Sequence, residues 1–134
     1  MKDTAIRVAM VLSIGLAIGV VAGDITDQPE QDVREVHVWT KQDSKAYARD
    51  GLIKWAGKQG VCLSALWGKE SAWNHQAVNP DKVMGKNAGG IPQLLGMSPT
   101  TPPTVQIDRG LAYIYYRYET PCKAWEFHKK KGWY

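Results

Sequence analysis

The sequence has few of the residues that commonly hold a metal ion. It contains two cysteines, Cys62 and Cys122, and three histidines, His37, His75 and His128. No two of them stand at the short spacing that zinc sites use. We therefore predict no metal site and no cofactor.

Internal repeats are also absent, and 134 residues are too few for two comfortable domains. Hydrophobic residues make up 44% of the chain and charged residues 22%, a composition typical of a folded protein. The sequence thus predicts one folded domain.

Long apolar runs are scarce, and the clearest is the sixteen-residue segment from Val8 to Gly23. It is short for a membrane span of about 20 residues and slightly long for a signal-peptide core of about 7–15. Lys2 and Arg7 precede it, which places the chain that follows outside the cytoplasm. Residues 1–23 are therefore predicted to be a signal peptide or a membrane anchor. If this segment is not cleaved, residues 8–23 would anchor the chain in the membrane.

Acidic residues become scarce after residue 42. Residues 1–42 carry 4 Lys and Arg against 6 Asp and Glu, whereas residues 43–134 carry 13 against 7. A basic domain favours an anionic partner such as nucleic acid, anionic lipid or a cell-wall polymer. The basic run at 129–131 is explained by a solvated helix end, and nucleic acid conflicts with export, so we predict no nucleic-acid partner.

The two cysteines suit an exported domain, in which a disulfide persists. A bond between Cys62 and Cys122 would close a loop of about 60 residues and stabilise the fold by roughly 4 kcal/mol. Two buried free thiols are the alternative.

The spacing of apolar residues predicts a mainly helical domain over residues 44–134, preceded by a linker over 24–43. A first helix begins with Ser44 as its cap and ends at Gly60. Further helices are predicted at 62–71, 104–119 and 121–131, and any sheet is confined to the Gly- and Pro-rich stretch 72–103.

Glu70 lies on the apolar face of the predicted helix 62–71. Cys62, Leu63, Leu66 and Trp67 share its spacing, so its carboxyl should be poorly solvated and its pKa raised. A glutamate with a raised pKa is the general acid that cleavage of a sugar–sugar bond requires. A structural ion pair with an arginine of the helix 104–119, or an outward rotation, is the alternative.

Three motifs in order resemble the soluble lytic transglycosylase domain of the lysozyme-like superfamily. They are Glu-Ser in "KESAWNHQAVNP", Gly-x-x-Gln in "AGGIPQ", and Ala-Tyr in "VQIDRGLAYIYYRYETPCKAWEFHKKKGWY". The closing segment is similar to the ends of small secreted and phage-borne members. The resemblance covers residues 44–134 and implies a mainly α (α+β lysozyme-like) fold, an extracytoplasmic or virion-associated location, and peptidoglycan as the partner.

The resemblance also implies residue roles. Glu70 would cleave the bond between N-acetylmuramic acid and N-acetylglucosamine, acting first as acid and then as base, to give a 1,6-anhydro product. Ser71 and Gln93 would hold the glycan near the acid, and Tyr113 would donate its hydroxyl to Glu70. The alternatives are an ordinary helix-end cap for Ser71, an amide bonded to its own backbone for Gln93, and core packing for Tyr113. Trp73, Trp133 and Tyr134 are candidates for stacking on a sugar face, with core or rim packing as the alternative for each.

The sequence departs from the family pattern after Ala-Tyr, where Ile114 replaces the usual Asn. A hydrolytic muramidase on the same fold would usually need a second carboxylate, for which Asp81 is the best candidate, although Asp81 suits a turn after Pro80. A non-catalytic wall-binding module is the remaining alternative. We prefer the mechanism with a single acid.

Overall fold

The computed structural model describes residues 36–52, 55 and 57–134. The predicted signal peptide or anchor over 1–23 lies outside the described residues, as does most of the predicted linker. Within the described part, no helix is both long enough and apolar enough to span a membrane.

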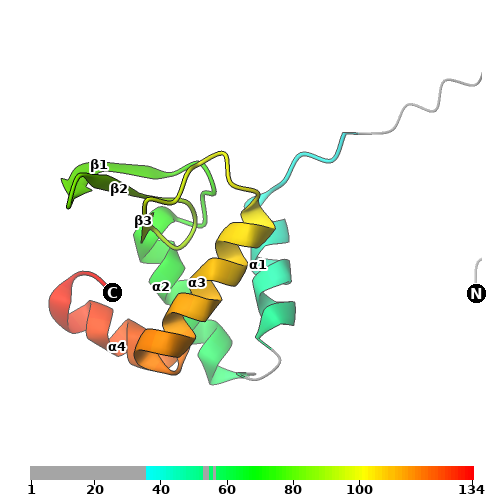
Figure 1. Ribbon diagram of the computed structural model, residues 1–134. Helices are drawn as coiled ribbons and strands as arrows, with labels where there is room; N and C mark the ends of the chain where they lie inside the picture. Colours follow the sequence, from blue (N-terminus) through cyan, green and yellow to red (C-terminus); the bar gives the residue numbers. More distant parts are fainter. Residues whose placement is uncertain (1–35, 53–54, 56) are drawn as a thin grey trace, which may run out of the picture. The chain divides into compact units, whose positions relative to one another are not determined.

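The described part is mainly helical, as predicted. Its four helices are α1 (Lys41–Gly51), α2 (Lys58–Ser71), α3 (Pro103–Tyr118) and α4 (Pro121–Lys131). Figure 1 shows α3 beside α1 and α2, with α4 following directly from the end of α3. The predicted bounds of the last helix are confirmed, because Thr120 caps it, Pro121 occupies its first turn and Gly132 ends it in a left-handed conformation.

A small antiparallel sheet lies within 72–103, where the sequence predicted any sheet to be. Its strands are β1 (Val78–Val83), β2 (Lys86–Gly89) and β3 (Leu94–Leu95), in the order β1-β2-β3. Met84 and Gly85 form the two-residue turn between β1 and β2, both with positive φ, as a tight hairpin requires. The strands lie to one side of the helices (Figure 1).

The first helix differs from its prediction. It begins at Lys41 because Thr40 and Asp43 form a capping box, in which each side chain bonds the other residue's backbone N–H. Ser44 is therefore not the cap; it is buried inside the helix, and its hydroxyl accepts a hydrogen bond of 2.7 Å from the indole N–H of Trp39. The helix also ends at Gly51, and a new helix begins at Lys58.

The hydrophobic core lies between the four helices and the loop that carries the second motif. Leu63, Leu66 and Trp67 of α2 meet Ile107 and Ile114 of α3, and all five side chains are fully buried. At about 1.5–3 kcal/mol for each large apolar side chain, this burial is the main stabilising term of the domain.

A disulfide joins Cys62 near the start of α2 to Cys122 near the start of α4. The predicted pairing is thereby confirmed. It closes a loop between residues 60 positions apart and ties the helix that carries Glu70 to the last helix.

Candidate functional site

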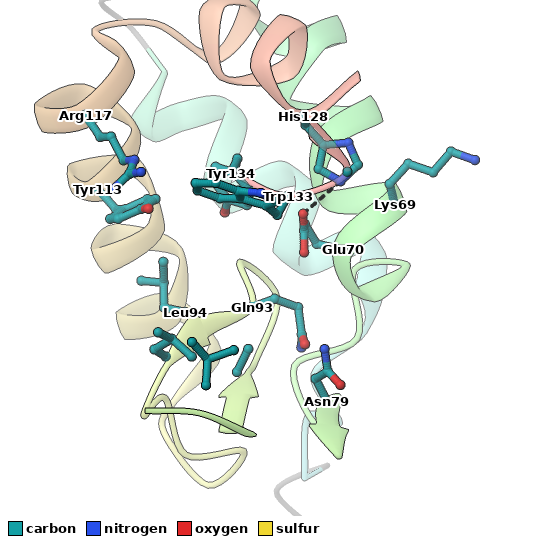
Figure 2. A pocket seen from close by; sticks show the side chains of 14 residues that line it. Lys69, Glu70, Asn79, Gln93, Leu94, Tyr113, Arg117, His128, Trp133 and Tyr134 are labelled. Atoms are coloured by element: carbon teal, nitrogen blue, oxygen red, sulfur yellow. Dashed lines mark ion pairs between the residues drawn. The ribbon is translucent and has the colours of Figure 1, made fainter. Parts of the chain in front are cut away.

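A cleft of about 880 Å³ opens between the end of α2, the sheet, α3 and the C-terminal segment. Figure 2 shows Glu70 and His128 on one side of it, Tyr113 and Arg117 on the other, and Gln93 and Leu94 below. Its lining residues are Lys69, Glu70, Asn79, Val83, Ala88, Gln93, Leu94, Leu95, Tyr113, Arg117, His128, Gly132, Trp133 and Tyr134. Among these described residues, Glu70 is the only one with an acidic side chain.

Glu70 is the last residue but one of α2, and its side chain is 16% exposed. Burial raises the pKa of its carboxyl from 4.5 to about 7. A negative charge at the C-terminal end of a helix is further disfavoured by the helix dipole. The neutral, proton-bearing form of Glu70 is therefore well populated near neutral pH, as a general acid requires.

His128 of α4 is the partner of Glu70. Its Nε2 lies 3.0 Å from Oε1 of Glu70, and its side chain is 15% exposed. Burial, together with the nearby charge of Lys69, lowers the pKa of His128. Burial favours the protonated form of Glu70 in the same way, so burial favours the uncharged form of both groups, and Nε2 and Oε1 lie within hydrogen-bonding distance.

No motif in the sequence links His128 to Glu70. The helical spacing of Ala124 and His128 placed His128 on the inward face of the last helix, and that was the available signal. The packing of α2 against α4 determines which inward-facing side chain contacts Glu70. Local spacing does not predict that packing.

Gln93 lines the same cleft as Glu70. It adopts a left-handed backbone conformation, with a φ of 51°. Its amide nitrogen donates to the carbonyls of Gly90 at 2.9 Å and Ala77 at 3.3 Å. The nitrogen is thus held by the backbone, which fixes the side chain and leaves the amide oxygen to accept from a ligand.

Ser71 does not line the cleft. Its hydroxyl donates to the carbonyl of Ile91 at 2.7 Å, so it connects the end of α2 to the loop of the second motif. Tyr134 holds the same loop: its buried hydroxyl accepts from the indole of Trp67 and donates to the carbonyl of Pro92, both at 2.8 Å. These bonds place Gln93 relative to Glu70.

Gln106, Gly90 and Gly110 allow this loop to pack against α3. The buried amide of Gln106 accepts from the backbone N–H of Ile91 at 2.8 Å and donates to the carbonyls of His75 and Thr101. A Cβ at Gly90 would lie 2.4 Å from the amide oxygen of Gln106, and one at Gly110 would lie 2.7 Å from Pro92. The two glycines therefore allow the loop to pack directly on α3.

Tyr113 lines the cleft across from Glu70, and the structure places no hydrogen bond between them in the described part of the chain. The side chain that contacts the carboxyl is that of His128, at Oε1. The Tyr113 ring instead packs edge-on against Tyr134, with ring centres 5.7 Å apart, beneath the guanidinium of Arg117.

Trp73 has a packing role. Its side chain is 4% exposed, its indole N–H donates to the carbonyl of Ser64, and its ring meets Trp67 edge-on. Its ring is therefore covered and cannot lie flat on a sugar in this structure. Trp133, which is 51% exposed and lines the cleft, is the aromatic residue available for such a contact.

Asp81 is exposed on β1 and is not among the residues that line the cleft. No group of three or more His, Cys, Asp or Glu side chains in the described residues could hold a metal ion.

Comparison with models of protein families, with curated proteins and with solved structures finds no match to this chain.

Proposed function

We propose that this protein is a peptidoglycan lytic transglycosylase with a lysozyme-like α+β domain. The observation that carries the proposal is Glu70, a carboxyl withdrawn from water at the edge of a sugar-sized cleft, with its pKa raised to about 7. A volume of 880 Å³ lies in the range of cavities that hold a small ligand. Export of the domain to the cell envelope is part of the proposal.

The reaction uses Glu70 twice. In the first step its proton passes to the oxygen between N-acetylmuramic acid and N-acetylglucosamine as the bond from that oxygen to the muramyl C1 breaks. In the second step the Glu70 carboxylate takes the proton of the muramyl C6 hydroxyl while its oxygen bonds to C1. The product is a 1,6-anhydro sugar, no water is consumed, and Glu70 regains its proton.

The lining of the cleft favours this route over hydrolysis. A hydrolase that uses two carboxylates places them about 5–10 Å apart on either side of the bond. The described residues that line this cleft supply one carboxylate side chain, that of Glu70. The amide of Gln93 and the exposed ring of Trp133 are groups that suit the hydroxyls and the faces of sugars.

The test is release of soluble fragments from a peptidoglycan suspension by the purified full chain. Glu70→Gln should abolish release, because the amide has no proton to give at neutral pH. Glu126→Gln, a matched change at an exposed carboxyl on the same domain, should release as much as wild type. Equal release by Glu70→Gln and wild type would contradict the proposed acid.

Mass spectrometry of the fragments identifies the reaction. Anhydro-muramyl ends, lighter than reducing ends by one water, are expected. Reducing ends would indicate a hydrolytic muramidase, and a chain that pellets with the wall but releases nothing would indicate a binding module.

A further inference from the structure

The contact between Glu70 and His128 distinguishes the two oxygens of the carboxyl. Oε1 lies 3.0 Å from Nε2 of His128. Figure 2 shows the other oxygen directed away from His128, toward the side of the cleft from which Gln93 comes. A sugar bound in the cleft can therefore reach Oε2, whereas Oε1 is occupied by the imidazole.

When the carboxyl of Glu70 and the imidazole of His128 are both neutral, their hydrogens can be placed in two ways. In one, the carboxyl proton lies on Oε1 and points at Nε2, which turns the acid away from the cleft. In the other, Nε2 carries hydrogen and donates to Oε1, so the carboxyl proton lies on Oε2 and points into the cleft. Only the second arrangement is competent for acid catalysis.

We propose that His128 is the positioning residue of Glu70: as a neutral imidazole with hydrogen on Nε2, it directs the acid's proton onto the oxygen that faces the cleft. The inference rests on the proposed function and adds a role for a residue outside the three motifs. The same N–H also stabilises the carboxylate that forms in the first step, because a hydrogen bond to a charged oxygen is about twice as strong as one between neutral groups.

The surroundings of His128 hold the ring and keep it neutral. Trp125, one turn earlier on α4, stacks on the imidazole with ring centres 5.4 Å apart and planes 21° apart. The charge of Lys69 on α2 opposes protonation of His128. The remaining ionisable groups of the cleft lining are Tyr113 and Arg117 on α3 and Tyr134 of the C-terminal segment, and none of them has an acidic side chain to stabilise an imidazolium.

The role is tested with His128→Gln and His128→Leu in the full chain. Glutamine places an amide N–H where Nε2 lies but does not titrate, and leucine offers no donor. We expect His128→Leu to lower kcat by about 10–100-fold with little change in KM, the range for a hydrogen bond to a charged group. His128→Gln should retain most of kcat. Wild-type kcat in a folded His128→Leu variant would overturn the proposal.

The pH profile separates positioning from mere packing. In wild type, an imidazolium at acidic pH favours the carboxylate form of Glu70 and weakens it as a base, so activity should fall on the acidic side. His128→Gln should lose this acidic limb and keep the fall above neutral pH that reports Glu70. His37→Gln, at an exposed histidine that lies 3.2 Å from Asp43, should leave the profile unchanged. An acidic limb that persists in His128→Gln would contradict the role.

Nitrogen NMR of the full chain reads the tautomer of His128 without any activity measurement. We expect hydrogen on Nε2 in the neutral ring. Hydrogen on Nδ1 in an active chain would overturn the role of His128, whereas hydrogen on Nε2 in a chain that releases no glycan would overturn the proposed function alone.

Discussion

Glu70 lowers the stability of the folded chain above neutral pH. Its pKa is 4.5 for a free side chain and about 7 in the fold, so the folded chain binds this proton more tightly than the unfolded chain does. Below about pH 4.5 both states hold the proton and the group has no effect on folding. As the pH rises to about 7 the stability falls, by on the order of 3 kcal/mol at 1.36 kcal/mol per pKa unit.

Glu70→Gln should therefore stabilise the domain in a pH-dependent way. The amide is neutral at every pH, so the variant should exceed wild type by on the order of 1–3 kcal/mol above about pH 7. The difference should shrink toward zero near about pH 4.5. Urea unfolding across this range measures it. Glu126→Gln, at an exposed carboxyl, should show no such trend, and a gain for Glu70→Gln that is constant with pH would refute the raised pKa.

At the residue level, the family resemblance implied that Gln93 lies beside Glu70, whereas local spacing predicted only that Glu70 lies on the apolar face of its helix. It did not predict the partner of Glu70 or the covered state of Trp73. These depend on α4 packing against α2 and on Trp67 and Trp73 meeting edge-on, with ring centres 5.3 Å apart.

At the scale of helices and loops, the contact between α3 and the loop that carries Gln93 determines where Gln93 lies in the cleft. The loop lies so close to the helix that Gly110 faces both Pro92 and Trp67. A Cβ there would lie 2.6 Å from a ring carbon of Trp67 and 2.7 Å from Cβ of Pro92. Neither neighbour can move freely, because Trp67 is fully buried and the carbonyl of Pro92 is bonded by Tyr134.

Gly110→Ala should destabilise the domain by about 1–3 kcal/mol, the usual cost of overpacking. It should also lower glycan release, since the displaced loop carries Gln93. Gly68→Ala is the matched control: it lies inside α2, its added Cβ meets no atom within 4 Å, and it should stabilise by about 0.5–1 kcal/mol. Thermal unfolding and the release assay measure both effects. Equal stability of Gly110→Ala and wild type would show that the loop is not held as described.

The helices differ in how well local signals predicted them. The last helix has Thr-Pro at its start and Gly at its end, so its bounds follow from capping alone. The cap of the first helix lies in the polar segment 24–43 that the sequence predicts to be a linker, where Thr40 and Asp43 bond each other. The apolar spacing of this helix continues past Gly51 to Trp55, so the periodicity predicted one helix up to Gly60. In the structure α1 ends at Gly51 and α2 begins at Lys58.

At the scale of the whole domain, α2 and α4 are joined at two levels. The disulfide of Cys62 and Cys122 joins the second turn of α2 to the first turn of α4, and Glu70 and His128 meet eight and six residues further along the two helices. At 1.5 Å per residue these contacts lie about 12 Å and 9 Å from the disulfide. The covalent bond thus helps to fix the relative position of the two helices that carry Glu70 and His128.

Loss of the disulfide should affect stability more than chemistry. Closing a loop of about 60 residues contributes roughly 4 kcal/mol on the chain-entropy model, so the variant with Cys62→Ala and Cys122→Ala should unfold at a markedly lower urea concentration. Glu70 and His128 still face each other in the folded fraction, because Leu63, Leu66 and Ala124 bury the helix contact without the bond. Glycan release well below the unfolding temperature should therefore stay within a few-fold of wild type and fail at a lower temperature. Loss of release from a folded variant would show instead that the disulfide sets the geometry of the acid directly.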